Sequence, residues 1–260
     1  MTWIDEDEKA ILHPQQRLTC RVVDLAPLTH DITRLRLAVE TGGPFVFSAG
    51  QYAALRFAEL PPRDYSMANR PDEALLEFHV RRMGAGSASA YVTEELQPGE
   101  RVVVDGPFGS CHLRENRAGP ILALAGGSGL APIKSIVETA LAQGRHQPIH
   151  LYYGARDERD IYLEEHFRAL AAAQANFRYT PVLSEPRRPS TRRSGLLHEA
   201  LAADFADLAG VKAYLAGPPA MVEATTELLE ARGVPRHDIH ADAFYSEAEK
   251  RARDAARSPP

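Results

Sequence analysis

Cysteines and long apolar runs are scarce in this chain of 260 residues, and each scarcity excludes a class of protein. The two cysteines, Cys20 and Cys111, stand too far apart to suggest a disulfide framework or a cluster of metal ligands. No apolar run reaches membrane-spanning length, and the start MTWIDEDEKAILHP is acidic where a secretory signal is basic. We therefore predict a cytoplasmic protein that does not enter a membrane and has no metal or iron–sulfur cluster in this chain.

An excess of charge of one sign is missing as well. The formal net charge is only −5, which gives a nucleic-acid role no electrostatic support. With 44% hydrophobic and 25% charged residues, the composition is that of an ordinary globular protein. Its length suits two domains that each have a core, and we expect a monomer.

What is present divides the chain near residue 120. Before that point, alternating runs such as ITRLRLAV and LLEFHVRR predict strands with one apolar face. In the second run, Leu76, Phe78 and Val80 are expected inside, with Glu77 and His79 on the polar face. Runs of this kind, bounded by glycine, proline and aspartate, favour an antiparallel barrel or sandwich, with one helix near SASAYVTEEL.

After residue 120 the pattern changes to strand, helix, strand, helix. Apolar runs such as ILALA, IHLYYGA, FRYTPVL and KAYLAG alternate with longer stretches such as APIKSIVETALAQ and AMVEATTELLEARG. Alternation of this type predicts a doubly wound parallel sheet with helices on both faces. We expect a linker-like segment over 1–16, a barrel domain over 17–115, an α/β domain over 120–245 and a mobile tail over 246–260.

The stretch GGSGLAP follows the first strand of the second half. Gly126, Gly127 and Gly129 can take positive φ and let a diphosphate approach the backbone. The next helix offers free N–H groups, with Pro132 tolerated in its first turn. Taken alone, the stretch is weak, because a plain tight turn explains it and the usual dinucleotide spacing is incomplete.

Two stretches of the first half add candidate ligand groups. In RDYSMAN, Arg63 is a fork of donors suited to phosphate, Tyr65 is a flat ring and Ser66 is a small hydroxyl. In GAGSAS, a glycine turn leads into a helix start rich in hydroxyls, which suits an anion. Each has an ordinary alternative: a surface arginine with a half-buried tyrosine for the first, and a serine N-cap for the second.

A fourth stretch, AGPPAM, ends a predicted parallel strand with the stiff corner 217–219. Ligands of open α/β sheets bind at that edge, although an ordinary loop explains the same residues. His237 and His240 lack an evident third ligand, so a surface pair is favoured over a metal site.

In this order, the motifs RDYS, GAGSAS, GPFG, AGGSGLAP, YYGARDERDIY, LAGPPAMV and ADAF resemble the ferredoxin–NADP reductase superfamily. The likeness is greatest to the reductase components of bacterial aromatic-ring oxygenases, and it covers residues 17–245. It implies a six-stranded antiparallel FAD-binding barrel followed by an NAD(P)-binding domain. It further implies an enzyme of aromatic catabolism that takes a hydride from NADH and passes electrons singly to a separate [2Fe–2S] ferredoxin or oxygenase component.

The resemblance also assigns roles to residues. It implies that Arg63 holds the FAD diphosphate, Tyr65 lies against the flavin ring, Ser66 hydrogen-bonds flavin N5 and Phe244 is the near-terminal aromatic residue beside the flavin. Further FAD contacts are assigned to His79, Val80 and Arg81, and to Gly86, Ser87, Ala88 and Ser89. The nicotinamide nucleotide is assigned to Gly127, Ser128, Gly129, Pro132, Gly217, Pro218, Pro219 and Met221.

Three features depart from the family pattern. Ala216 stands where relatives often carry cysteine, and Phe244 is followed by a further YSEAEKRARDAARSPP. The C-x₄-C-x₂-C spacing of a fused [2Fe–2S] domain is missing, so either the ferredoxin is a separate protein or the chain is a truncated or diverged form. Two alternative functions stay open: a flavin or diaphorase-type reductase with a small-molecule acceptor, and a flavin electron-transfer subunit without turnover of its own.

The stretch PVLSEP bears on the choice between NADH and NADPH. By the resemblance, members that use NADPH place a Ser-Arg pair here, and the arginine meets the 2′-phosphate. Ser184 is kept, but Glu185 stands in place of the arginine. A carboxylate repels a 2′-phosphate and accepts a hydrogen bond from a 2′-hydroxyl. Asp157 adds negative charge, and although arginines at 156, 187 and 188 oppose it, we predict a preference for NADH.

Overall fold

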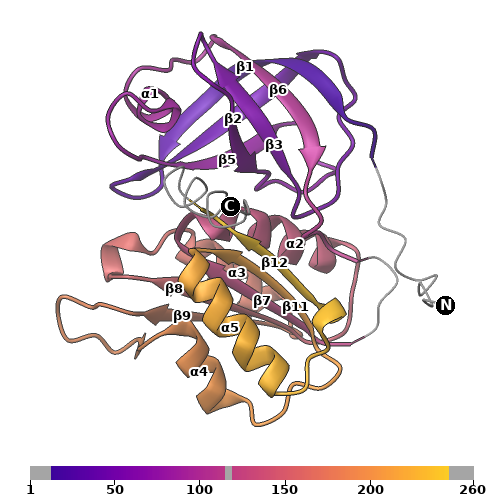
Figure 1. Ribbon diagram of the computed structural model, residues 1–260, viewed down its shortest axis with the longest axis vertical. Helices are drawn as coiled ribbons and strands as arrows, with labels where there is room; N and C mark the ends of the chain where they lie inside the picture. The colour runs from indigo at the N-terminus through magenta and orange to yellow at the C-terminus, as the bar shows by residue number, and fades with distance from the viewer. Residues whose placement is uncertain (1–12, 115–118, 246–260) are drawn as a thin grey trace, which may run out of the picture.

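A computed structural model describes residues 13–114 and 119–245 of the chain. Figure 1 shows two bodies stacked on one another, a barrel from the first half of the chain and a layered α/β body from the second. Residues 1–12 of the predicted linker and the predicted tail over 246–260 lie outside the described residues. Among the described residues, no helix is long and apolar enough to cross a membrane.

The barrel is one antiparallel sheet of six strands in the order β4-β3-β6-β1-β2-β5. The expected alternation is clear on β2, where Leu35 and Leu37 are fully buried and Arg34 and Arg36 pair with carboxylates. The elements of the barrel are β1 (Gln16–Pro27), β2 (Ile32–Thr41), β3 (Tyr52–Phe57), β4 (Arg63–Ser66), β5 (Leu76–Arg81), α1 (Ala88–Glu94) and β6 (Arg101–Phe108).

The barrel closes at a seam, where its two edge strands β4 and β5 come together. An isolated antiparallel bridge joins Met67, just past β4, to Phe78 of β5. Beside it, the Ala68 N–H donates to the Glu77 carbonyl at 2.7 Å. Within the described residues, no strand pairing continues past Phe78 on this side of β5. The seam therefore presents backbone donors and acceptors of both edge strands to whatever lies against it.

The second half forms a parallel sheet in the order β10-β9-β8-β7-β11-β12. The chain runs outward from β7 through β8 to β9 and then returns to β11 on the other side of β7, so the carboxyl ends of β7 and β11 mark a topological switch point. Helices α2 and α3 pack on one face and α4 and α5 on the other, over separate hydrophobic clusters. The elements are β7 (Ile121–Gly126), η2 (Gly127–Gly129), α2 (Leu130–Ala142), β8 (Ile149–Ala155), η3 (Glu158–Asp160), α3 (Glu164–Ala173), β9 (Phe177–Leu183), β10 (Arg193–Ser194), α4 (Leu197–Asp204), β11 (Lys212–Gly217), α5 (Pro219–Ala231), η4 (Arg236–Asp238) and β12 (Ile239–Ala243).

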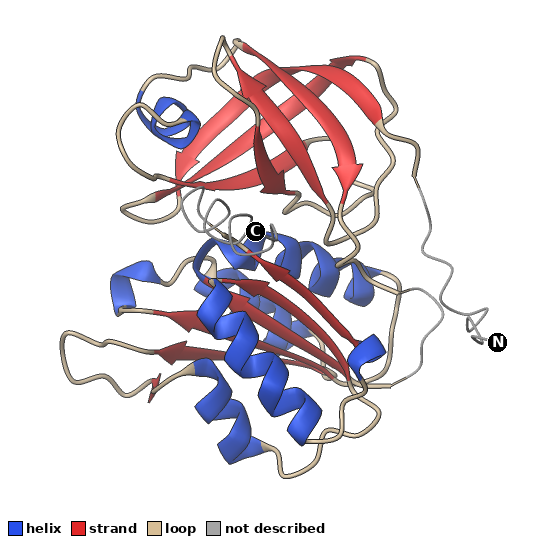
Figure 2. Ribbon diagram, in the orientation of Figure 1, coloured by secondary structure: helices blue, strands red, loops and turns tan. Residues whose placement is uncertain are grey.

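This architecture confirms the predicted fold, an antiparallel barrel followed by a doubly wound parallel sheet, as Figure 2 shows by element type. The expected alternation of β5 is wrong on one face. Glu77 and His79 are only 5% and 4% exposed, although their face was expected to be polar and solvated. They are buried because Lys134 of α2 and Tyr162 of the α/β body pack against them, which the pattern within one strand cannot reveal.

Candidate active site

Strand β4 brings three of the predicted flavin residues to the barrel seam. Arg63 is half-buried, and its guanidinium donates to the Pro62 carbonyl at 3.1 Å without an ion pair among the described residues. Burial raises the pKa of Tyr65 to about 12, so its phenol stays neutral, with the ring 6.3 Å from that of Phe57. Ser66 is 8% exposed, and its hydroxyl bonds to no other described residue. The strand thus offers a cation with free donors, a flat ring and a hydroxyl.

The end of β5 lies across the seam from β4. His79 is buried beside the Tyr162 hydroxyl, which lies 3.2 Å from Nδ1, and burial lowers the His79 pKa, so the ring is neutral near pH 7. The Arg81 Nε donates to Asp31 of the β1–β2 turn at 2.9 Å, and the side chain lines a pocket that the barrel shares with the α/β body. The strand predicted to edge the flavin therefore reaches the nucleotide side as well.

The turn predicted to hold the FAD diphosphate is exposed. Gly86 has a φ of +72°, which favours glycine, and a Cβ there would meet no atom within 4 Å. Ser87 caps α1 by accepting from the Ala90 N–H at 3.1 Å, while the Ser89 hydroxyl accepts from the Met83 N–H at 3.0 Å. The N-cap alternative is therefore correct for Ser87, and the bare backbone at Gly86 leaves room for a phosphate.

The turn after β7 is closed by packing instead. Of its three glycines, Gly127 takes a positive φ, +54°, whereas Gly126 and Gly129 do not use that freedom. Their φ angles are −128° and −60°. A Cβ on Gly126 would lie 2.5 Å from Met221 Sδ, and one on Gly129 would lie 2.1 Å from the Ala216 carbonyl oxygen. Glycine is required here because the turn packs directly on the connection from β11 to α5.

A pocket of about 280 Å³ lies at the switch point of the parallel sheet. Most of its wall comes from the ends of β7, β8 and β9 with the loops that follow them, from the β10–α4 connection and from the β11–α5 connection with the start of α5. The barrel contributes the β1–β2 turn and the end of β5. Among the predicted nucleotide and flavin residues, the lining includes Arg81, Gly127, Ser184, Pro218 and Met221. The predicted nucleotide residues outside the lining are Ser128, Gly129, Pro132, Glu185, Gly217 and Pro219.

The charged residues that bear on the choice between NADH and NADPH do not lie where the sequence analysis expects them. Glu185 is exposed and lies outside the pocket lining, and its N–H donates to the Arg156 carbonyl at 2.8 Å. Arg156 lines the pocket and has no ion pair among the described residues. The Arg187 N–H donates to Asp157 and holds the pKa of that carboxyl below its ordinary value. Arg156 is therefore the charge of this group that reaches the pocket wall.

The residues present fit two dinucleotides. On the barrel, the free guanidinium donors of Arg63 and the open backbone at Gly86 suit a diphosphate, and the Tyr65 ring suits a flat heterocycle. In the pocket, a Cβ on Gly127 would come within 3.4 Å of Arg81 Nη1, so the turn backbone and a guanidinium face the same space. That pairing of turn amides with a cation suits a second diphosphate.

Two family models match the chain: the oxidoreductase FAD-binding domain over residues 19–113 and the oxidoreductase NAD-binding domain over 123–227. The ferredoxin–NAD(P)⁺ reductase component of the naphthalene 1,2-dioxygenase/salicylate 5-hydroxylase systems of a Ralstonia species is 43% identical over 242 residues, which are 93% of this chain and 73% of the relative. The chain belongs to the ferredoxin–NAD(P)⁺ reductase family.

Further members of this reductase family support the assignment. The reductase component of the naphthalene 1,2-dioxygenase system of Pseudomonas putida is 40% identical over 93% of this chain and 73% of its own. The crystal structure of an Amycolatopsis cytochrome P450 reductase superposes with a TM-score of 0.83 at 35% identity, over 90% of this chain and 72% of that one. The predicted family, the FAD-binding barrel and the NAD-binding domain are thereby confirmed.

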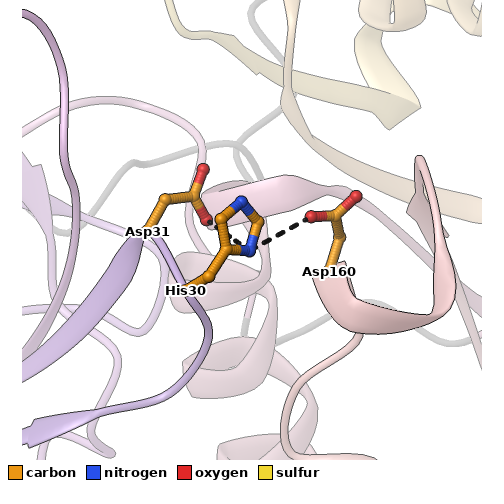
Figure 3. A group of neighbouring side chains, drawn as sticks. All are labelled: His30, Asp31 and Asp160. Atoms are coloured by element: carbon orange, nitrogen blue, oxygen red, sulfur yellow. Dashed lines mark ion pairs between the residues drawn. The ribbon is translucent and has the colours of Figure 1, made fainter.

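Three side chains of this reductase that the sequence argument missed join its two domains at the pocket (Figure 3). His30 Nδ1 lies 3.9 Å from Asp31 and 3.6 Å from Asp160, and both carboxylates line the pocket. Burial acts to raise the Asp31 pKa, but the Thr29 hydroxyl and the Arg81 guanidinium outweigh it and hold that pKa below its ordinary value. Asp31 and Asp160 are 129 positions apart in sequence, so no local motif predicts that these side chains lie together.

Phe244 directly follows β12 at the carboxyl edge of the sheet. Its N–H donates to the Gly217 carbonyl at 2.9 Å, and its partly buried ring packs against the hydrophobic cluster that lies on the α2 face. Gly217 itself has a φ of +149°, and a Cβ there would lie 3.0 Å from the Gly126 backbone. Phe244 is thus fixed near the edge that carries the pocket, and its contact with flavin stays a prediction.

Proposed function

We propose that this reductase takes a hydride from NADH and passes electrons one at a time to a separate [2Fe–2S] ferredoxin or oxygenase component. One observation carries the proposal: a single pocket has walls from both domains, and Arg81 of the strand at the barrel seam faces Gly127 of the nucleotide turn. FAD supplies two-electron acceptance and one-electron release. The chain supplies placement, because hydride transfer requires donor and acceptor in contact.

We infer the following roles from the site. Arg63 binds the FAD diphosphate with donors that no described carboxylate engages. Tyr65 packs its neutral ring against the flavin, and the buried Ser66 hydroxyl hydrogen-bonds the flavin edge. On the nucleotide side, Arg81 and the Gly127 backbone hold the diphosphate of NADH, while Pro218 and Met221 wall the nicotinamide. These roles follow the assignment implied by the resemblance, except that Arg81, assigned there to FAD, is placed here on the diphosphate of NADH because it lines the pocket.

The nature of the acceptor follows from the relatives. The Ralstonia and Pseudomonas relatives are named as ferredoxin–NAD(P)⁺ reductase components of dioxygenase systems, which favours a protein acceptor over a small molecule.

The test is purified chain with FAD and NADH, assayed first with a dye and then with a [2Fe–2S] ferredoxin. We expect one noncovalent FAD per chain, dye reduction, and faster ferredoxin reduction. Protein that cannot be loaded with FAD overturns the proposal, and dye reduction without ferredoxin reduction favours a diaphorase.

We further propose that NADH is preferred over NADPH. Glu185 directly follows Ser184, which lines the pocket, and the Arg187 N–H donates to Asp157. Arg156 opposes this preference from within the pocket wall. We expect kcat/KM to favour NADH by more than about tenfold, since like charges placed together cost several kcal/mol. Glu185→Ala should narrow the ratio and Arg156→Ala should widen it, whereas equal use of NADPH by the unaltered chain contradicts the proposal.

A further inference from the structure

A buried charged cluster between the two domains takes no part in the roles given above. It centres on Glu77 of β5 and Lys134 of α2, which are 5% and 8% exposed. Figure 1 shows α2 on the side of the α/β body that faces the barrel. Removing such charges from water is unfavourable unless every donor and acceptor is paired. The burial of this cluster therefore calls for an explanation of what its charges do.

Lys134 is fully satisfied, and its partners come from both domains. Its Nζ lies 3.0 Å from the Ala68 carbonyl oxygen, 3.1 Å from a Glu138 carboxylate oxygen and 3.4 Å from a Glu77 carboxylate oxygen. An ammonium has three protons, and three acceptors surround this one. The next residue, Ser135, donates its hydroxyl to the Asn69 carbonyl at 2.6 Å. Two successive side chains of α2 therefore hold the segment directly after β4.

The barrel side of the cluster is equally constrained. Glu77 accepts from Arg36 at 2.8 Å and lies 3.2 Å from His79 Nε2. Burial acts to raise the Glu77 pKa, but His79, Lys134 and Arg36 outweigh it and keep the carboxyl ionised. The Glu77 N–H donates to the Asn69 side chain at 3.0 Å, which joins β5 to the same segment that Ser135 holds. The seam and α2 thus share one set of hydrogen bonds.

The chain between this tie and the proposed reacting groups is short and stiff. Lys134 lies five residues after Gly129, about 7.5 Å along the helix axis at 1.5 Å per residue. Ala68 lies two residues after Ser66, so at most about 7 Å of extended chain separates them. A shift of α2 against Ala68 would consequently move the nucleotide turn against Ser66 by a similar amount.

We propose that Lys134 and Ser135 are positioning residues that set the distance between the Gly127–Gly129 turn and Ser66, and hence between hydride donor and flavin. The inference rests on the proposed function. Directional bonds from a saturated ammonium fix one register of α2 on the seam, whereas a purely apolar contact tolerates sliding. Neither residue is part of the pocket lining, so each acts through the elements it joins.

The test uses the FAD-loaded chain with Lys134→Met, Lys134→Arg and Ser135→Ala. Lys212→Met is the matched control, because Lys212 is also buried and pairs with the buried Asp238 inside the α/β body, away from the barrel. Stopped-flow reduction by NADH should slow on the order of 10²-fold in Lys134→Met, since a misplacement of about 1 Å has that effect. NADH affinity should change little, and Lys134→Arg should recover most of the rate.

Amide hydrogen exchange gives a readout that does not depend on turnover. In Lys134→Met and Ser135→Ala, the amides of residues 67–69 should exchange roughly tenfold faster or more, as the tie opens locally. Lys212→Met should leave these amides at the wild-type rate. If Lys134→Met does not fold, Ser135→Ala, which removes one hydrogen bond, decides the matter by the same two measurements.

The outcomes separate this proposal from the function on which it rests. If the unaltered chain is not reduced by NADH at all, the proposed function fails. If the unaltered chain is reduced but Lys134→Met and Ser135→Ala match Lys212→Met in rate and in exchange at residues 67–69, the positioning role is overturned and the function stands.

Discussion

The flavin side and the nucleotide side of this site are built in different ways. On the nucleotide side, Gly126, Gly129 and Gly217 are glycine because a Cβ would meet backbone or the Met221 side chain at 3.0 Å or less. On the flavin side, Gly86 has only open space around it. The nucleotide turn is therefore fixed by the protein's own packing, and the flavin turn is shaped by backbone conformation and a serine cap.

Because the two sides are built differently, substitutions on them should have different consequences. A substitution on the nucleotide side forces the β7 turn away from β11 and should damage the fold before it damages binding. A substitution on the flavin side alters groups with spare hydrogen-bonding capacity, such as Arg63 and Ser66, and should damage binding or chemistry while the fold stands. The predictions below test this division.

The largest effect is expected for Gly129→Ala. Its Cβ would lie 2.1 Å from the Ala216 carbonyl oxygen, and neither is the end of a flexible side chain. We expect a loss of about 3 kcal/mol or more of unfolding free energy, seen as a fall in Tm of about 6 °C or more. Gly84→Ala is the control, because a Cβ there meets nothing within 4 Å. Equal Tm values for the two variants would show that the turn is not held by packing.

Ser66→Ala should leave the fold intact and slow the chemistry. The hydroxyl bonds to no other described residue, so its removal leaves no described partner unsatisfied. If it supports flavin N5 as proposed, reduction by NADH should slow on the order of 10²-fold, as for a lost transition-state donor. Stopped-flow spectroscopy measures the rate, and FAD content with Tm serves as the control. A wild-type rate removes Ser66 from the site.

The same division explains what the sequence could predict. Strands such as β8, β9 and β11 carry their signal in their own apolar runs, so their bounds were predicted correctly. The site motifs contain the glycines of their own turns, so the turns could be predicted from neighbouring residues. Gly127 does take a positive φ. Gly129 has a φ of −60°, and glycine is required there because a Cβ would meet the carbonyl oxygen of Ala216, 87 positions later in the chain.

Contacts between the two domains could not be predicted from the sequence, because their partners also lie far apart in the chain. Alternation along β5 correctly marks Leu76 and Phe78 as core but assigns Glu77 to solvent. The burial of Glu77 arises from Lys134 on α2, which is far from Glu77 in the sequence. A lysine within the otherwise apolar start of APIKSIVETALAQ is the one local sign, and it gives no hint of its partner.

A smaller effect is expected for Gly86→Ala. The left-handed φ of +72° should destabilise the chain by about 1 kcal/mol. Gly99→Ala is a matched control, because Gly99 has a φ of +97° and equally open surroundings in a turn before β6. Both variants should lose similar stability, but only Gly86→Ala should also weaken FAD binding, measured by fluorescence titration. Equal FAD affinities for the two variants would separate the turn from the diphosphate.

The smallest effect is a change in how stability depends on pH, and it should arise from His150 in the nucleotide domain. Burial, with a contribution from Arg178, lowers the pKa of His150 on β8 to about 4. Because this folded pKa lies below the ordinary value, the unfolded chain binds a proton that the folded chain does not, and stability falls as the pH drops from about 6.5 to about 4. His150→Gln should therefore take up about one proton fewer on unfolding and flatten the dependence of Tm on pH in that range. An unchanged slope in His150→Gln would show that His150 titrates alike in the folded and unfolded states.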